Sequence, residues 1–219
     1  MKRHSSSGAG AVRIIGGEWR GTRLPVADVG GLRPTSDRVR ETLFNWLQPK
    51  LAGARVLDLF AGSGALGLEA VSRGASEAWL VERDPVLAEA LRGTAERLKA
   101  GARVQVARAD ALAWLQAPLH GRFDVVFLDP PFDAGLWAQA LERLPPWLAD
   151  DAWLYLERPA LEGPAVGGPG HAQPDPGGGW QQHRAGRTRE VRYALYRRAH
   201  GAAATLQADL HADGATTSA

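Results

Sequence analysis

Residues 55–73 read RVLDLFAGSGALGLEAVSR, and this stretch decides the fold. The apolar run over 55–60 predicts a buried strand, and the run over 64–73 predicts a helix. Between them lies a G-x-G-x-x-G pattern at Gly62, Gly64 and Gly67. This spacing is typical of a strand–turn–helix unit that receives a nucleotide-like ligand, although a tight turn that binds nothing has the same composition.

Glu82 favours the ligand-binding interpretation. It ends the next apolar run, 77–82, in the part of the sequence that follows Asp58 and the glycine turn. An acid at the end of the second strand can accept hydrogen bonds from ribose hydroxyls. Both a nicotinamide dinucleotide and S-adenosylmethionine fit these two features.

The rest of the central sequence alternates between strand and helix patterns. Strands are expected at 77–82, 103–108, 123–129 and 152–157, and helices at 64–73, from the Asp84-Pro85 cap to Lys99, from Asp110, and at 135–144. Alternation of this kind predicts a Rossmann-like α/β domain with a mostly parallel, doubly wound sheet, whose ligands sit at the carboxyl ends of the strands. Residues 180–198 can add two antiparallel strands at the C-terminal side.

The flanking segments divide the chain into parts. Residues 12–24 predict a short β-hairpin around Gly16-Gly17, and Thr35 or Ser36 can cap the helix that follows. We therefore expect a 12–50 extension and a 51–198 main domain. The 159–179 segment has seven Gly and five Pro, which predicts a flexible loop, and we expect disorder in 1–11 and 199–219.

Composition excludes several classes of function. The chain of 219 residues has no cysteine, and its six histidines show no metal-ligand spacing. Disulfides, thiolate metal sites and cysteine nucleophiles are therefore excluded. The sequence also lacks a run of about 18 apolar residues and an apolar signal core, so we expect a cytoplasmic protein with no membrane and no metal partner.

Charge is unevenly distributed. Residues 1–50 hold nine Lys and Arg against four Asp and Glu, and residues 181–198 hold six Arg against one Glu, so each flank carries +5. The centre, 51–158, holds eleven basic against fifteen acidic residues, a balance of −4. Most charge runs are solvated faces, but basic flanks are also the pattern of a protein that binds nucleic acid.

Three features favour S-adenosylmethionine over a dinucleotide. Asp58 lies at the end of the first strand, where a carboxylate can help hold a positively charged methionine portion. Asp110 ends the third strand, where it can meet an adenine amino group, although a solvated acid at a strand end is the alternative for Asp110 and for Glu82. The fourth strand ends in D-P-P-F at 129–132, for which a dehydrogenase has no use.

The chemistry of D-P-P-F suits transfer of a methyl group to an exocyclic amine. The lone pair of such an amine is delocalised into the base, and acceptors placed at its hydrogens free that lone pair. The Asp129 carboxylate and the Pro130 carbonyl can act as these acceptors, and the adjacent prolines fix their geometry. Phe132 can stack on the base, a contact of about 1–3 kcal/mol. The alternative is a rigid loop with an ordinary core phenylalanine.

With these motifs, the chain resembles the RsmD family of bacterial small-subunit rRNA guanine-N2 methyltransferases. The resemblance lies in RIIGGEWRG at 13–21, GLRPTSDRVRETLFNWL at 31–47, DLFAGSGALGLEA at 58–70 and FLDPPF at 127–132. It covers about 12–157 and 180–197, and the 31–47 stretch is the most family-specific. The 159–179 loop and the 199–219 tail depart from the family pattern.

The resemblance implies S-adenosylmethionine near Gly62, Gly64, Glu82 and Asp110, and a target base at Asp129, Pro130 and Phe132. It implies methylation of the N2 amino group of a specific guanine in 16S rRNA, with the rRNA in a small subunit or its assembly intermediate. It also implies rRNA contacts from six arginines of the N-terminal region: Arg13, Arg20, Arg23, Arg33, Arg38 and Arg40. We expect the enzyme to be a monomer.

Two other functions stay open on the sequence. A DNA or RNA adenine-N6 methyltransferase also uses D-P-P-aromatic, but the DNA enzymes usually carry a dedicated target-recognition region, and no stretch here is long enough. A non-catalytic rRNA-binding module with a methyltransferase fold is the second alternative, and the intact Asp129 and glycine turn argue against it.

Overall fold

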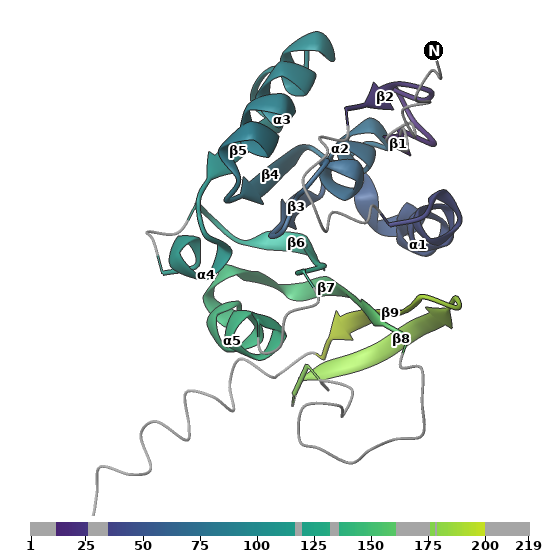
Figure 1. The fold of residues 1–219 in the computed structure, drawn as a ribbon. Helices are drawn as coiled ribbons and strands as arrows, with labels where there is room; N and C mark the ends of the chain where they lie inside the picture. Colours follow the sequence, from purple (N-terminus) through teal and green to yellow (C-terminus); the bar gives the residue numbers. More distant parts are fainter. Residues whose placement is uncertain are drawn as a thin grey trace, which may run out of the picture.

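The computed structural model describes residues 12–25, 35–116, 120–131, 136–160, 176–177 and 179–199 (Figure 1). Two candidate site residues, Arg33 and Phe132, lie outside these ranges. The predicted disordered ends and most of the 159–179 loop lie outside them as well.

A seven-stranded sheet forms the centre of the protein. Its strand order is β5-β4-β3-β6-β7-β9-β8. The strands are β3 (Arg55–Asp58), β4 (Glu77–Glu82), β5 (Val104–Arg108), β6 (Phe123–Leu128), β7 (Leu148–Pro159), β8 (Trp180–Arg187) and β9 (Val191–Arg198). The five strands from β5 to β7 are parallel, and β9 and β8 are antiparallel additions. The predicted mostly parallel sheet with antiparallel C-terminal strands is confirmed.

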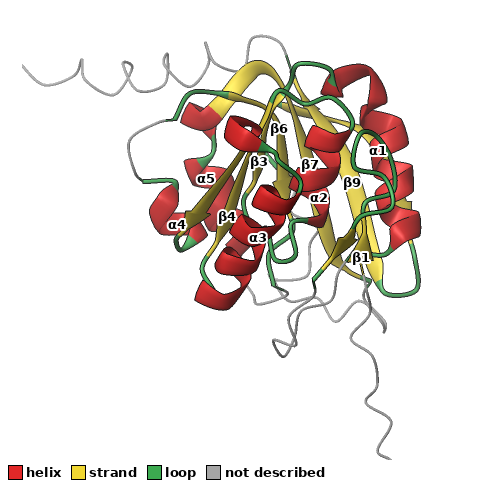
Figure 2. Cartoon of the chain, turned by 90° about the horizontal axis from the view of Figure 1, so that it is seen from above, coloured by secondary structure: helices red, strands yellow, loops and turns green. Residues whose placement is uncertain are grey.

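Helices cover both faces of the sheet, as Figure 2 shows. They are α1 (Asp37–Leu51), α2 (Ala65–Ser72), α3 (Pro85–Arg97), α4 (Ala111–Trp114) and α5 (Leu136–Arg143), with short 3-10 helices at Gly101–Arg103 and Pro145–Trp147. Asp84 caps α3 by accepting the Val86 and Leu87 N–H groups at 2.8 and 3.0 Å, as predicted. Ser36, not Thr35, caps α1, because its hydroxyl oxygen accepts the Val39 N–H.

The two faces bury separate hydrophobic clusters. The first cluster packs α1, α2 and α3 against side chains such as Phe127, Tyr155 and Leu195. The second packs α4, α5 and Trp147 against side chains such as Leu154, Leu156 and Tyr196. Because strand residues alternate between faces, these clusters identify the face to which each strand residue points.

The N-terminal hairpin joins the first cluster. It pairs β1 (Val12–Arg13) with β2 (Arg23–Leu24), and Val12, Ile14, Trp19 and Leu24 are buried. The predicted hairpin is therefore present, and the hairpin and α1 share a hydrophobic core with the sheet.

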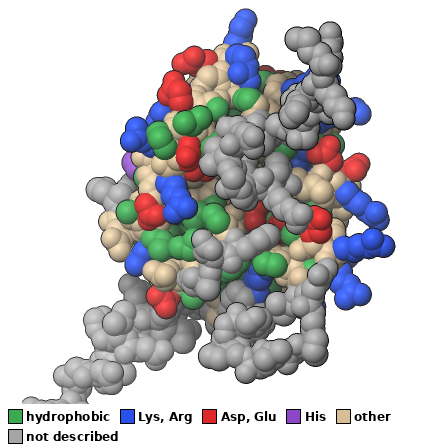
Figure 3. Space-filling model, viewed as in Figure 1, with side chains coloured by type: hydrophobic (Ala, Val, Ile, Leu, Met, Phe, Trp, Pro, Cys, Tyr) green, Lys and Arg blue, Asp and Glu red, His purple; other side chains and the backbone are tan. Residues whose placement is uncertain are grey.

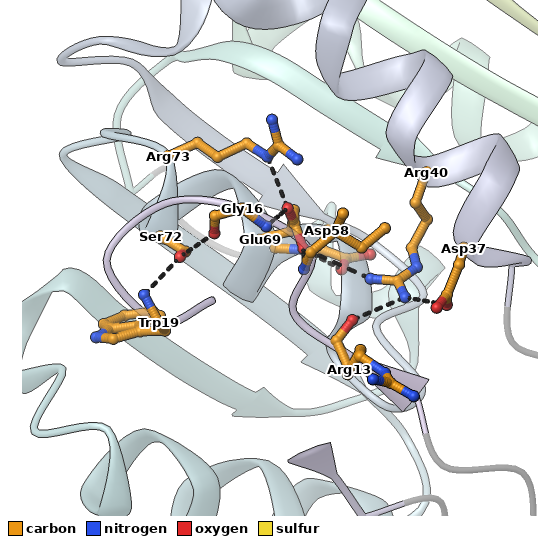
Figure 4. Close-up of polar contacts among 11 residues, drawn as sticks. Arg13, Gly16, Trp19, Asp37, Arg40, Asp58, Glu69, Ser72 and Arg73 are labelled. Carbon is orange, nitrogen blue, oxygen red and sulfur yellow. Dashed lines mark hydrogen bonds and ion pairs between the residues drawn. The ribbon is translucent and has the colours of Figure 1, made fainter. Parts of the chain in front are cut away.

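Polar groups of α2 fix the position of the hairpin (Figure 4). The buried Glu69 carboxylate accepts the Ile15 and Gly16 N–H groups at 2.6 and 2.8 Å. The Ser72 hydroxyl donates to the Gly16 carbonyl at 2.6 Å and accepts the Trp19 N–H at 2.9 Å. Buried backbone groups need such partners, so the hairpin is held on α2 by specific hydrogen bonds as well as by apolar contact.

Candidate active site

Five acidic residues lie at or near the carboxyl ends of the five parallel strands. Asp58 ends β3 and Glu82 ends β4, Asp110 follows β5, Asp129 follows β6, and Glu157 lies near the end of β7. The strand after β3 in the chain, β4, lies on one side of β3, and β6 lies on the other. This reversal of strand order is the place where ligands of open α/β sheets bind.

The glycines of the turn after β3 have different tasks. Gly64 has a φ of 75°, in the left-handed region that other residues rarely adopt, and it is the residue that precedes α2. Gly67 lies inside α2, and a Cβ there would stand 2.1 Å from a methyl carbon of Leu80. Gly67 is therefore required for close packing of α2 on the sheet, whereas Gly62 and Gly64 shape the turn itself.

The Glu82 carboxylate organises the same turn. One oxygen accepts the Gly62 N–H at 2.9 Å, and the other accepts the Asp84 N–H at 2.8 Å. Each carboxylate oxygen can accept a further hydrogen bond. Glu82 is half-buried, and its contact with ribose hydroxyls stays a prediction.

Asp110 has a structural role as a helix cap, in addition to its predicted contact with an adenine amino group. It is exposed and caps α4, with one carboxylate oxygen accepting the Leu112 and Ala113 N–H groups, each at 3.0 Å. The capping bonds use one oxygen only, so the other keeps its capacity for a ligand amino group.

Asp58 is buried at the start of the glycine turn. Its carboxylate accepts the Gly67 N–H at 2.9 Å. Burial raises the pKa of Asp58 from 3.8 to about 7; the Gly67 N–H opposes this rise, and the negative charge of Glu82 adds to it. A cation bound beside Asp58 would favour its charged form.

Asp129 is held by a residue from the start of α1. The Thr35 hydroxyl donates to the Asp129 carboxylate at 3.2 Å, although 94 residues separate the two in sequence. Burial, followed by the charges of Glu157 and Asp58, raises the pKa of Asp129 well above 3.8, and the Thr35 hydrogen bond lowers it part of the way.

Glu157 and Tyr155 form a second layer behind Asp129. Glu157 is buried on β7, and the Tyr155 hydroxyl donates to its carboxylate at 2.6 Å. Burial raises the pKa of Glu157, and the hydrogen bond from the Tyr155 hydroxyl lowers it part of the way.

The first proline after Asp129 is buried and the second is exposed. Within the described part of the chain, no hydrogen bond uses the Pro130 carbonyl oxygen. Its predicted contact with a substrate amine stays a prediction.

The predicted RNA-contacting arginines separate into two groups. Arg13, Arg20, Arg23 and Arg38 are exposed, and none of them forms an ion pair within the described ranges. Arg40 is fully buried, which contradicts its expected contact with RNA. Its guanidinium donates to the Arg13 carbonyl and to Asp37 at 2.9 and 2.6 Å, and lies 3.6 Å from the Glu69 carboxylate (Figure 4).

Arg40 is buried because it neutralises Glu69. A buried carboxylate is costly without a cation or several hydrogen bonds, and Glu69 obtains both from Arg40, Arg73 and the hairpin backbone. Arg40 is therefore part of the packing between α1, α2 and the hairpin.

The acids at the sheet edge fit a ligand that carries positive charge. Among the residues that the structure describes, no Lys or Arg forms an ion pair with Asp58, Glu82, Asp129 or Glu157. In the same ranges, no group of three His, Asp or Glu side chains could hold a metal ion, and no helix could cross a membrane. The sulfonium and ammonium groups of S-adenosylmethionine suit such an edge.

The sequence interpretation missed Thr35 and Glu157. Thr35 was considered only as a helix cap, a task that belongs to its neighbour Ser36. Glu157 is an acid near a strand end, the same signal that identified Asp58 and Glu82, so this signal could have been applied to the fifth strand as well.

Comparison with known proteins agrees with this geometry. The sequence model of the family described as "Conserved hypothetical protein 95" matches residues 12–197. The ribosomal RNA small subunit methyltransferase D of Escherichia coli K12 is 45% identical over 200 residues, which cover 90% of this chain and 96% of that protein. The protein of the same name from Haemophilus influenzae is 47% identical over 152 residues, or 68% and 79% of the two chains.

Solved structures support the same relationship. The Escherichia coli structure described as methyltransferase yhhF is 42% identical, with a TM-score of 0.74 over 87% of this chain and 99% of that one. A methylase structure from Haemophilus influenzae is 37% identical, with a TM-score of 0.69 over 87% and 100% of the two chains. The chain belongs to the family of these small-subunit rRNA methyltransferases, the RsmD family.

Proposed function

We propose that this protein transfers a methyl group from S-adenosylmethionine to the N2 amino group of a specific guanine in 16S rRNA. The observation that carries the proposal is the Asp129 carboxylate, which accepts the Thr35 hydroxyl at the carboxyl end of β6, directly before Pro130. The names and the high identity of the relatives support rRNA of the small subunit as the substrate.

Three acids of the edge would hold the cofactor. Glu82 would receive the ribose hydroxyls, Asp58 would face the positively charged methionine portion, and Asp110 would meet the adenine amino group. The bound cofactor supplies an electrophilic methyl group. The glycine turn at Gly62 and Gly64 lets this ligand approach the backbone closely.

Asp129 and Pro130 would act on the target amine. The Asp129 carboxylate accepts one amino hydrogen and the Pro130 carbonyl accepts the other, which frees the nitrogen lone pair for attack on the methyl group. The Asp129 charge then offsets the positive charge that develops on nitrogen. The proton leaves the nitrogen only after methylation, when the amine has become acidic.

Thr35 and Glu157 would set the protonation state of Asp129. Asp129 must be ionised to offset the positive charge on the amine nitrogen, and the Thr35 hydrogen bond favours the ionised form. Glu157 has the opposite effect, because its charge raises the pKa of Asp129. The target base must leave its stack to reach this edge, which favours an unpaired nucleotide.

Exposed arginines would hold the RNA. Arg13, Arg20 and Arg23 lie on the hairpin and Arg38 on the first turn of α1, the helix whose start donates to Asp129 through Thr35. We expect a monomeric enzyme in the cytoplasm that acts on the small subunit or its assembly intermediate.

Methyl transfer to purified small subunits tests this proposal. Subunits from a strain that lacks the corresponding methyltransferase should accept radiolabelled methyl from S-adenosylmethionine, and fully methylated subunits should not. Label that appears in DNA, or no transfer to either subunit preparation, would contradict the proposal. The first result would favour an adenine-N6 DNA enzyme, and the second a non-catalytic RNA-binding module.

A further inference from the structure

Three arginines lie side by side on the last three strands of the sheet. The register pairs Arg158 of β7 with Arg192 of β9, and Arg192 with Arg187 of β8. Residues paired in this way have Cβ atoms about 4.5–5.5 Å apart, so the three side chains form a continuous row. We call Arg158, Arg192 and Arg187 the arginine row.

The arginine row points to the face that α4 and α5 cover. Leu154 and Leu156 of β7, and Ala194 and Tyr196 of β9, pack in or against the cluster on that face. Arg158 and Arg192 follow the same alternation, and Arg187 shares their side because it is the direct partner of Arg192. The exposed arginines of the hairpin and of α1 belong to elements on the opposite face.

The arginine row also lies next to Asp129 and Pro130, where the target base would bind. Leu128 of β6 pairs with Leu156 of β7, so Asp129 and Glu157 follow at one level, and Pro130 and Arg158 at the next. After Pro130 and Pro131 the chain continues to α5, which covers the same face as the row. Figure 3 shows Lys and Arg side chains projecting from the side of the molecule where α1 and the turn between β8 and β9 lie in Figure 1.

The like charges of the arginine row do not favour folding of the sheet. Like charges directly opposite each other on neighbouring strands destabilise a sheet. Arg158 is half-buried, and burial lowers its pKa to about 10. Within the described ranges, no carboxylate pairs with Arg187 or Arg192.

Arg198 lies on β9 like Arg192, but its contacts are different. It is buried on the same face, and its guanidinium donates to the Leu148 and Ala149 carbonyls at 3.3 and 3.2 Å. Arg198 thus has a structural role, whereas Arg187 and Arg192 form no ion pair within the described ranges and add positive charge near the edge that holds the active site.

We propose that the arginine row binds backbone phosphates of the substrate RNA, on the face of the sheet opposite the one that carries the N-terminal arginines. The inference rests on the proposed function, because RNA is the polyanion that this active site would receive. RNA would then be held on both sides of the edge at which Asp129 lies. The exposed Arg189, in the turn between β8 and β9, extends the same surface.

The salt dependence of RNA binding tests this inference. The variant Arg187→Gln/Arg192→Gln should flatten the slope of log Kd against log salt for small subunits by about 1.4–1.8, the amount expected for two lost phosphate contacts. The affinity for S-adenosylmethionine should stay at the parent value. The midpoint of thermal unfolding should stay equal or rise, because two like charges have been removed.

A matched variant elsewhere serves as the control. Arg92→Gln/Arg122→Gln also removes two exposed arginines, each paired with an exposed acid and remote from the carboxyl edge, and its slope should equal that of the parent. If the Gln variant loses cofactor affinity, Arg187→Lys/Arg192→Lys decides instead, and it should keep the parent slope.

The outcomes distinguish the two proposals. Methyl transfer by the parent together with an unchanged slope in the Gln variant would overturn the arginine row and leave the proposed function intact. A flatter slope of log Kd against log salt in the Lys variant would also overturn the proposed role of the arginine row, because a positive charge alone should suffice for phosphate contact. A parent that neither binds nor methylates subunits would overturn the proposed function itself.

Discussion

Thr35 and Ser36 are adjacent hydroxyl residues with different tasks. Ser36 accepts the Val39 N–H and begins α1, whereas Thr35 turns to the Asp129 carboxylate. The start of one helix thereby reaches the end of the central strand β6. At the scale of the residue, the state of the active site depends on which protons Asp129 and its neighbours hold.

The pH profile of catalysis should reveal the role of Thr35. The Asp129 carboxyl offsets the positive charge that develops on the amine nitrogen only when ionised, so the rate should rise as pH passes its raised pKa. Thr35→Val removes a hydrogen bond that lowers this pKa, so the rising part of the profile should move to higher pH, with a loss of about tenfold at the acid end. Thr35→Ser should follow the parent. Single-turnover rates measure this, and a Val profile that superimposes on the parent would refute the role.

The raised pKa of Asp58 should make the free energy of unfolding depend on pH. Between 3.8 and about 7 the folded protein keeps a proton that the unfolded chain has released. The folded state then binds more protons, so the free energy of unfolding falls as pH rises through this window, by about 4 kcal/mol from this group. Asp58→Asn should lose that component and also bind S-adenosylmethionine more weakly. Parallel stability curves for the variant and the cofactor-free parent would contradict this.

At the scale of the element, the N-terminal hairpin is fixed to α2 and α1 through one buried cluster. Glu69 joins the hairpin backbone, Arg73 and Arg40, and Arg40 continues to Asp37 and the Arg13 carbonyl. A hairpin with strands of two residues has no core of its own, so this cluster positions its exposed arginines.

Arg38 and Arg40 form a matched pair for testing this arrangement. They lie two residues apart on α1, one exposed and one buried. Arg40→Ala leaves Glu69 with less compensation and should lower the free energy of unfolding by about 3 kcal/mol. Arg38→Ala should change it by less than about 0.5 kcal/mol, yet flatten the salt slope of subunit binding by about one. Denaturant unfolding and filter binding measure the two effects; equal losses of stability would contradict the assignment.

At the scale of the whole molecule, the sequence predicted those features that depend on residues close together in the chain. The apolar run at Phe123–Leu128 is buried on both faces, so it identified the central strand, and the glycine turn with Glu82 identified the ligand edge. Arg40 was misassigned because its partner Glu69 lies on another helix. The contact between Thr35 and Asp129, and the register that aligns Arg158 with Arg192 and Arg187, are long-range pairings that no local pattern encodes.

The most direct measurement is nucleoside mass spectrometry of 16S rRNA from small subunits treated with the parent and with Asp129 variants. The parent should produce N2-methylguanosine at one nucleotide. Asp129→Ala should bind S-adenosylmethionine nearly normally and lose most of the product, and Asp129→Asn, which keeps an acceptor oxygen without the charge, should give an intermediate yield. N6-methyladenosine in place of N2-methylguanosine would contradict the substrate, and full activity of Asp129→Ala would contradict the mechanism.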